Sequence, residues 1–203
     1  MKIALIGATG YVGSNLLTEA LQRGHEVTAI ARHASTLRAR VGLNPLALDI
    51  THSESLVAAL LPHDVVVVAV KCLGLNQAQL VEAIQRSSTT RTVLIGGAGS
   101  LHLPSGIDLV DSEQMPQQYR QEAMATREWL RLWRQQTDIN WTFISPSALL
   151  IPGQRTGQFR IGRDQLLFDA NGKSSISVED FATAVINELE VPQHVQQRFT
   201  VGY

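Results

Sequence analysis

The sequence predicts an α/β fold in which a doubly wound parallel β-sheet is covered by helices on both faces. Two observations support this prediction. Short runs of β-branched and apolar residues alternate with segments of helical periodicity along the chain. In addition, residues 65–70 read VVVVAV, without a polar residue, which is typical of a strand buried on both faces at the centre of a parallel sheet.

The expected strands are apolar runs bounded by turn residues. In chain order they are residues 3–6, 27–31, 45–48, 65–70, 92–95, 141–144, 166–168 and 198–203. One helix is expected directly after the first strand and its glycine-rich turn. Further helices are expected at residues 53–60, 77–85 and 112–136, and from residue 178 onward.

Helix boundaries are indicated by capping and breaking residues. Gly24 follows the first helix, where a C-terminal cap is expected, and Pro62 follows the second helix. Ser177 and Asp180 precede an apolar run with the spacing of a capping box, with Asp in the place of Glu. The late helix has Trp129 and Trp133 at helical spacing, and we expect both side chains in the core.

Composition narrows the function classes. The chain has 203 residues, 44% of them hydrophobic, which predicts one domain. Its net charge of −1 leaves no excess of basic residues for binding nucleic acid or anionic lipid. Cys72 is the single cysteine, so a disulfide framework is excluded. The histidines lack metal-binding spacing, so no metal site is expected. With no signal-peptide core and no membrane-length apolar run, we expect a cytoplasmic protein.

A glycine-rich loop follows the first strand with the spacing G-x-x-G-x-x-G. Gly7 permits a tight turn, Gly10 lets the backbone approach a pyrophosphate, and Gly13 allows close helix packing. The amides at the helix start would then bind the anion. The alternative is a structural turn without a ligand. The dinucleotide contacts expected here are Gly7, Thr9, Gly10, Tyr11, Val12 and Gly13.

The end of the second strand indicates which dinucleotide is bound. Sites for NAD usually place an acidic residue there for the ribose 2′-hydroxyl, whereas this chain has Arg32 and no acid in the next ten positions. An arginine can pair with a 2′-phosphate, so NADP(H) is expected over NAD(H). Asp49 and Ile50 are expected at the adenine edge, although Asp49 is equally interpretable as a turn cap. The alternative for Arg32, less favoured than the 2′-phosphate contact, is a solvated surface side chain.

Further residues follow later strands at the same edge of the sheet. Ala69, Val70 and Lys71 end the fourth strand, and Lys71 either reaches the phosphates, the nicotinamide ribose or an anionic acceptor, or extends into solvent. Three more residues follow the sixth strand and are expected beside the nicotinamide amide: Ser145, Pro146 and Ser147.

Together these residues resemble the atypical short-chain dehydrogenase/reductase superfamily. The likeness covers essentially the whole chain and rests on the glycine loop, Arg32, Asp49-Ile50, and the segments GGAGS at 96–100, SPSA at 145–148 and SISVED at 175–180. Within it, the chain is most similar to the NAD(P)H-binding group of NADH-flavin reductases, related to NmrA-like proteins and biliverdin reductase B. The resemblance implies a single Rossmann-type domain over residues 1–203, with a small substrate-side lobe at about 147–177 that would accommodate the acceptor.

The active-site residues of the family are only partly present. Most catalytic short-chain dehydrogenases use a Tyr-x-x-x-Lys pair, whereas the matching region here has Tyr119 followed by Ala123 in the lysine position. An unassisted tyrosine titrates near 10 and is a poor acid–base group at neutral pH. By the resemblance, Ser100 matches the family's active-site serine, although a serine that only satisfies its turn is equally plausible. Ser100 and Tyr119 are the catalytic candidates.

The resemblance implies hydride transfer from NAD(P)H to a planar acceptor such as a flavin or a quinone. Flavin reduction needs mainly the correct stacking of two rings, because solvent can supply a proton. An alternative is a non-catalytic, NmrA-like redox sensor that acts through a protein partner. A sugar-nucleotide epimerase or dehydratase is disfavoured by the missing lysine and the short segment after the sixth strand. The sequence does not predict an oligomeric state.

Other conspicuous side chains have simpler interpretations. His102 lies close to Ser100 and is the histidine nearest the expected site. Cys72 is adjacent to Lys71, which would lower its pKa if the two interacted, but a half-buried inert thiol is the preferred interpretation. Phe159 would either stack on an acceptor ring or pack in the core, and packing is preferred.

Overall fold

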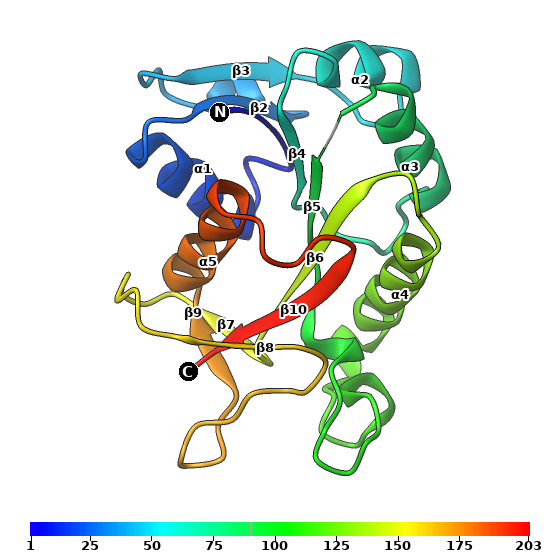
Figure 1. Ribbon diagram of the computed structural model, residues 1–203, viewed down its shortest axis with the longest axis vertical. Helices are drawn as coiled ribbons and strands as arrows, with labels where there is room; N and C mark the ends of the chain where they lie inside the picture. The colour runs from blue at the N-terminus through cyan, green and yellow to red at the C-terminus, as the bar shows by residue number, and fades with distance from the viewer. Residues whose placement is uncertain (90) are drawn as a thin grey trace.

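Strands and helices alternate along the chain, as the sequence predicts (Figure 1). The computed structural model describes residues 1–89 and 91–203. The strands are β1 (Lys2–Ile6), β2 (Glu26–Ala31), β3 (Leu43–Ala47), β4 (Val65–Val68), β5 (Arg91–Ile95), β6 (Asn140–Pro146), β7 (Leu149–Ile151), β8 (Arg160–Gly162), β9 (Ser175–Ser177) and β10 (Gln197–Gly202). The helices are α1 (Tyr11–Gln22), α2 (Ser53–Leu60), α3 (Gln77–Arg86), α4 (Gln117–Arg134) and α5 (Val178–Glu190).

The central sheet confirms the predicted fold class. Within the described residues it has eight strands in the order β3-β2-β1-β4-β5-β6-β10-β8. The pairings from β3 through to β10 are parallel, and β8 is antiparallel to β10. The chain reverses direction across the sheet between β1 and β4, which creates the switch point where ligands bind in doubly wound folds.

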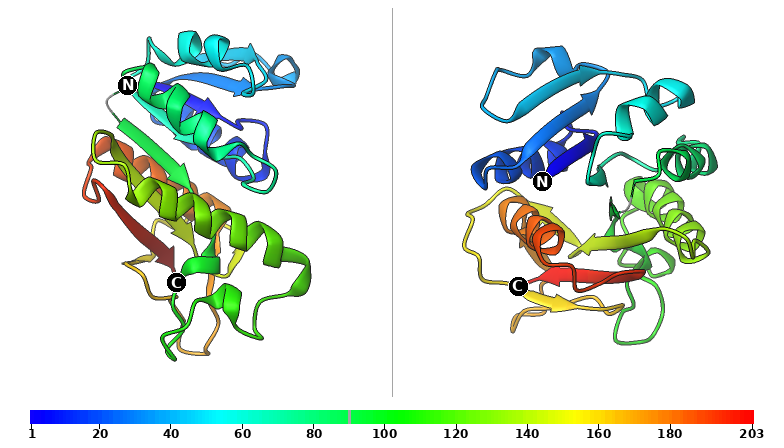
Figure 2. Two further views of the ribbon diagram at one scale, coloured as in Figure 1. Left: turned by 90° about the vertical axis from the view of Figure 1, so that its right-hand side faces the viewer. Right: turned by 45° about the horizontal axis from the view of Figure 1, so that its top comes forward.

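The two faces of the sheet are covered by different helices (Figure 2). On one face α1 and α5 pack against each other and bury side chains such as Leu16 and Phe181. On the other face lie α2, α3 and α4, where Trp129 and Trp133 meet edge to face with ring centroids 5.5 Å apart. Both indoles are buried, so their predicted core role is confirmed.

Half of the capping box predicted at the start of α5 is present: Ser177 caps the helix, but Ser177 N donates to Tyr203 Oη at 3.2 Å and not to the Asp180 carboxylate. The Ser177 hydroxyl oxygen accepts a hydrogen bond from the Asp180 amide at 3.0 Å. This contact satisfies one of the otherwise unpaired amides in the first turn. The Asp180 side chain is used elsewhere, as described below.

Two element boundaries and one expected strand differ clearly from the predictions. The apolar run after Asp64 is a strand only as far as Val68, and the late helix begins at Gln117 instead of residue 112. The segment before that helix instead holds a 3₁₀ turn, Leu109–Asp111. The expected strand at 166–168 is wrong: Leu166 is buried because it packs against Leu101, Leu103 and their neighbours, and not because it pairs in a sheet.

Two segments build the region beyond the carboxyl ends of β5 and β6. Residues 101–116 and 163–174 lie below the sheet in Figure 1 and share a small apolar cluster that includes Leu103, Val110 and Leu166. Part of the expected lobe, β7 and β9, forms a separate two-stranded parallel sheet, whereas β8 joins the central sheet. The sequence predicted that residues 147–177 alone would form this lobe beyond the carboxyl ends of β5 and β6. In the structure, the segment 101–116 contributes to it as well.

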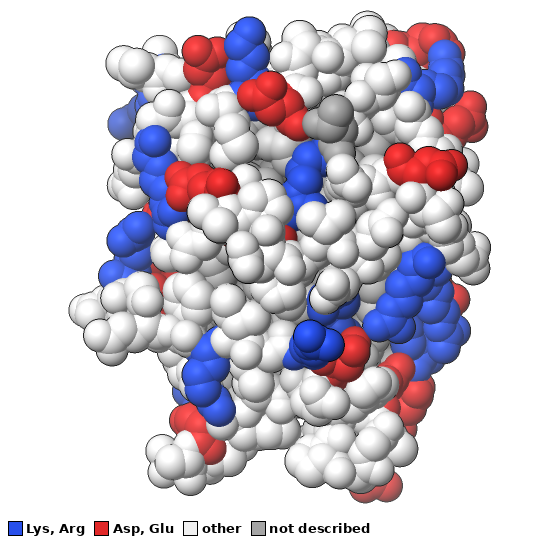
Figure 3. All heavy atoms as spheres, viewed as in Figure 1, with Lys and Arg blue, Asp and Glu red and all other residues white. Residues whose placement is uncertain are grey.

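Charged side chains of both signs are interspersed on the face shown in Figure 3. No helix in the described parts of the chain has the length and hydropathy needed to cross a bilayer. The cytoplasmic location expected from the sequence stays a prediction.

Candidate functional site

The first turn of the glycine loop requires a glycine for steric reasons. Gly7 has φ +86°, and a Cβ on it would lie 2.3 Å from the carbonyl oxygen of Ala69. Its amide donates to Ile30 O at 2.8 Å, so the loop is held between the ends of β1, β2 and β4. Gly13 is equally constrained, because its Cβ would lie 2.1 Å from Gly7 O. These two glycines fix where α1 begins.

Gly10 is different, because its surroundings leave more space. The nearest protein atom to a Cβ there would be Gly7 O at 3.3 Å, and the residue is exposed together with Thr9 and Tyr11. Gly10 is the N-cap of α1 and has no side chain to satisfy the first amides, and no acidic residue lies in the first turn. A Cβ would fill the space in front of these amides. The geometry therefore fits a dinucleotide pyrophosphate.

Arg32 and Asp49 lie near each other at the carboxyl ends of β2 and β3. Leu48 N donates to Ala31 O at 3.2 Å, and Arg32 is exposed. The Asp49 carboxylate accepts from Thr51 N at 3.0 Å and Thr51 Oγ1 at 2.9 Å. The Thr51 contacts, with smaller effects of His52 and Arg32, hold the pKa of Asp49 below its usual range. The turn-cap interpretation of Asp49 is thus confirmed, and its contact with adenine stays a prediction.

The loop after β4 is held by a residue that the sequence did not indicate. Glu122 on α4 accepts from Cys72 N at 2.6 Å and from Leu73 N at 3.0 Å. Lys71, just before these amides, is exposed at the same edge. Cys72 is buried, and burial raises the pKa of its thiol to about 11. Cys72 is thus buried more completely than expected, and its low reactivity stays a prediction.

The lysine position of the usual catalytic pair is used for packing. Ala123 on α4 lies against the 3₁₀ turn Ala98–Ser100, and a Cβ on Gly99 would be 2.7 Å from the Ala123 Cβ. Tyr119, one turn earlier on the helix, is 58% exposed. The structure thus gives Tyr119 no neighbouring lysine from α4, and its catalytic role stays a prediction.

Ser100 is connected to a buried arginine that the sequence analysis missed. The side chain of Arg198 on β10 is 1% exposed. Its Nη1 donates to Ser100 Oγ at 3.2 Å and to Ser145 Oγ at 3.5 Å, and its Nη2 donates to Ser100 O at 3.2 Å. Its Nε donates to Asp164 Oδ1 at 2.8 Å. Arg198 therefore connects the segments that follow β5 and β8 with the carboxyl end of β6.

The serines after β6 have partners inside the protein. Ser145, Pro146 and Ser147 are buried, and the Ser147 hydroxyl donates to Val201 O at 2.9 Å. A Cβ on Gly202 would lie 2.3 Å from Ser147 Oγ, so this serine packs directly against β10. The contacts of these three residues with a nicotinamide stay predictions.

His102 belongs to an ion-pair cluster beside Ser100. Its Nδ1 lies 2.9 Å from Asp108 Oδ1, and Arg127 Nη1 lies 3.2 Å from the other oxygen of that carboxylate. Asp164 also pairs with Arg134 Nη2 at 3.1 Å. Burial would raise the pKa of Asp164, but its pairing with Arg198 outweighs burial and lowers it.

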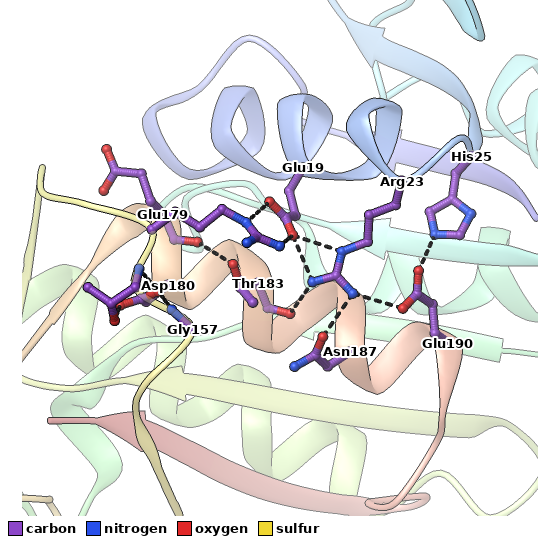
Figure 4. Close-up of polar contacts among 11 residues, drawn as sticks. Glu19, Arg23, His25, Gly157, Glu179, Asp180, Thr183, Asn187 and Glu190 are labelled. Carbon is purple, nitrogen blue, oxygen red and sulfur yellow. Dashed lines mark hydrogen bonds and ion pairs between the residues drawn. The ribbon is translucent and has the colours of Figure 1, made fainter.

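Residues 152–158, here called the strap, cross from β7 toward β8 beside the N-termini of α1 and α5 (Figure 4). Arg155 pairs with Glu19 through two hydrogen bonds of 2.8 and 2.7 Å. Asp180 accepts from Thr156 N and Gly157 N, both at 2.8 Å. The following Phe159 packs against the α1/α5 core, as preferred. Figure 4 also shows Arg23 joining Glu19 of α1 to Glu190 of α5.

Comparison with known proteins agrees with this geometry. Residues 7–192 match the family model described as NAD(P)H-binding. The uncharacterized protein YwnB of Bacillus subtilis is 38% identical over 99% of this chain and 98% of its own length. Solved structures of short-chain dehydrogenases/reductases at 18% identity share the fold.

Solved structures with higher sequence identity also match the whole chain. A protein from Bacteroides thetaiotaomicron, named as a candidate epimerase, is 38% identical, with a TM-score of 0.94 and 96% of its own chain covered. A candidate NADH-flavin reductase from Streptococcus pneumoniae is 30% identical, with a TM-score of 0.86 and 99% of its own chain covered. The chain therefore belongs to the family of NAD(P)H-binding proteins that this model describes.

Proposed function

We propose that this protein is a reductase that prefers NADPH to NADH and passes the hydride to a flavin or another planar, quinone-like acceptor. The observation that supports it most is Ala123 in the place of the lysine, packed against Gly99. Reduction of a carbonyl by the usual mechanism needs a tyrosine whose pKa is lowered by that lysine. Acceptors that take a proton from solvent do not need this pair.

In this proposal the chain's contribution is binding and orientation. The amides at the start of α1 hold the pyrophosphate, Arg32 pairs with the 2′-phosphate, and Lys71 reaches the phosphates or the acceptor. When bound, the dinucleotide supplies a hydride at its nicotinamide ring. Ser100, at the end of β5, contacts the acceptor and fixes its orientation.

The names of the two solved relatives point to different reactions. The Streptococcus pneumoniae protein is named as a candidate NADH-flavin reductase, which agrees with our proposal. The Bacteroides thetaiotaomicron protein is named as a candidate epimerase. In the present chain the missing lysine disfavours epimerase chemistry, and it is equally compatible with a dinucleotide sensor that acts on a protein partner.

The proposal is tested by steady-state oxidation of NADPH and NADH, followed by the loss of dihydronicotinamide absorbance, with FMN, riboflavin and a small quinone as acceptors. Binding of each dinucleotide is measured in parallel by thermal shift. Turnover that is faster with NADPH supports the reductase. Clear binding without turnover on any acceptor contradicts the reductase and favours the sensor.

A further inference from the structure

Arg198 reaches Ser100 because of two strand registers. In the parallel pairing with β6, Arg198 lies opposite Phe143. In the antiparallel pairing with β8, Thr200 lies opposite Gly162, and continuing this register brings Asp164 opposite Arg198. The Arg198 side chain thus starts between two neighbouring segments, and Asp164 holds its Nε while its Nη atoms extend to Ser100.

The chemistry of the guanidinium determines which group is the donor and which the acceptor in the hydrogen bond between Arg198 and Ser100. Arginine has donors and no acceptor, so Ser100 Oγ is the acceptor of the 3.2 Å hydrogen bond from Nη1. Within the described residues, no hydrogen bond is found in which the Ser100 hydroxyl is the donor. The Ser147 hydroxyl, by contrast, donates to Val201 O. The Ser100 proton therefore has no acceptor among the described residues, although Ser100 is only 6% exposed.

The charge at this position is maintained by the surroundings. Burial lowers the pKa of Arg198, but the Asp164 carboxylate opposes that shift, and a guanidinium stays protonated in proteins. A hydroxyl that accepts from a cation is a stronger donor to its own acceptor. Helix α4 supplies no lysine here, because Ala123 stands in its place. The positive charge beside Ser100 comes instead from Arg198 on β10.

We propose that Arg198 is a positioning residue that orients and polarises the Ser100 hydroxyl as a hydrogen-bond donor to the hydride acceptor. This inference rests on the proposed function. In the reaction, the acceptor gains a hydride, which carries two electrons, from the dinucleotide, which is thereby oxidised, and a proton from solvent completes the reduced product. Negative charge develops on an oxygen or nitrogen of the acceptor, and the Ser100 donor stabilises that charge while keeping its own proton. The preferred substrates are therefore conjugated acceptors with such an atom, as in flavins and quinones.

The test is a double-mutant cycle with Ser100→Ala, Arg198→Lys and the double variant. Lysine keeps a positive charge for Asp164 but lacks the fork needed to reach Ser100 at the same time. Each single variant is expected to lower kcat about 10- to 100-fold, with an unchanged Kd for NADPH. If Arg198 acts through Ser100, the double variant loses no more than the worse single variant.

A binding measurement accompanies the kinetics. Quenching of FMN fluorescence, with oxidised dinucleotide present, gives the Kd of the acceptor without turnover. We expect each single variant to weaken FMN binding about threefold to tenfold, again without a further loss in the double variant. Arg134→Met is the matched control, because Arg134 pairs with the same Asp164 but makes no hydrogen bond to Ser100. This variant should keep both kcat and the Kd for FMN.

The outcomes separate the two proposals. An active wild-type protein whose Ser100 and Arg198 variants lose activity multiplicatively, with a matching fall in melting temperature, overturns the positioning role and leaves the reductase intact. Wild-type activity in Arg198→Lys overturns it too. If Arg198→Lys does not fold, Arg198→Met combined with Asp164→Asn removes the buried charge together with that of its carboxylate partner, and this double variant takes its place in the cycle. A wild-type protein that binds NADPH but reduces no acceptor overturns both proposals.

Discussion

Ala123 and Gly99 are in such close contact that a single added methyl group would separate the helix and the turn that they belong to. A Cβ on Gly99 would lie 2.7 Å from the Ala123 Cβ, closer than two carbon atoms pack. Gly99→Ala should therefore lower the free energy of unfolding by about 1–3 kcal/mol, measured by urea denaturation. Gly97→Ala is the control, because its Cβ would lie 3.7 Å from Thr126 Cγ2 in ordinary contact. Equal stabilities of the two variants would contradict the packing argument.

Gly10→Val should abolish dinucleotide binding and leave the protein folded. The valine side chain would occupy the space in front of the first amides of α1, where only Gly7 O lies within 3.5 Å of a Cβ, at 3.3 Å. We expect the Kd for NADPH to rise by about 100-fold or more, with a cooperative thermal transition retained. Gly7→Ala, at φ +86° and with a Cβ 2.3 Å from Ala69 O, should instead destabilise the fold itself. Normal NADPH binding by the Gly10 variant would remove the site from this loop.

Arg32→Glu should weaken NADPH binding about 10- to 100-fold and change NADH binding far less, because a charge-assisted contact to the 2′-phosphate is lost. Isothermal titration with both dinucleotides measures this difference. Arg38→Glu makes the same charge change in the same exposed loop and controls for long-range electrostatics. If Arg32→Glu affects both dinucleotides equally, Arg32 does not contact the 2′-phosphate.

Asp180→Asn should release the strap and lower the free energy of unfolding by about 2–4 kcal/mol at neutral pH. Burial would raise the pKa of Asp180, but hydrogen bonds from Thr156, Gly157 and Tyr203 outweigh it and lower the pKa below its usual range. A lowered folded-state pKa stabilises the protein above the ordinary carboxyl pKa of about 4, and this stabilisation is lost as the pH falls through the folded value.

The stability difference between wild type and Asp180→Asn should therefore be constant above about pH 5 and shrink on further acidification. Glu179→Gln is the control, because Glu179 accepts one strap hydrogen bond, from Gly153 N at 2.9 Å. Its effect on stability should be smaller. A difference between wild type and Asp180→Asn that persists at low pH would show that the carboxylate charge is not responsible.

Cys72 should react very slowly with a disulfide reagent at neutral pH. Its thiol is buried and its pKa is raised to about 11, so the reactive thiolate is scarce in the folded protein. Labelling should become fast only in denaturant, which a colorimetric thiol assay measures. Rapid labelling of the native protein would indicate a reactive cysteine.

Much of the fold follows from local pattern. The valines of β4 and the alternation of strands with helices indicate a parallel sheet without knowledge of any tertiary contact. Strand 166–168 was predicted wrongly because burial of Leu166 comes from packing against the segment after β5. The short β8, with Ile161 55% exposed, has too few residues for a recognisable period.

The candidate site likewise contains some residues that a local motif predicts and others that only tertiary contacts bring together. The glycine loop and Arg32 are local in sequence, so a motif identifies them. The sequence gives only one indication of Arg198, a charged residue near the start of a strand, and its partners depend on the register of β10 with β8. Glu122 reaches the amides after β4 from a helix 49 and 50 positions away. Such contacts follow from tertiary packing, which one sequence does not encode in any short pattern.

The position of β10 between β6 and β8 has a consequence for the biosynthesis of the protein. A ribosome releases residues in order, so β8 must wait without its sheet partner until residues 197–202 have emerged. Until then Ser100 also lacks Arg198, although the glycine loop and Arg32 are long since available to fold. During translation, the contacts around Ser100 can therefore be completed only in the final step.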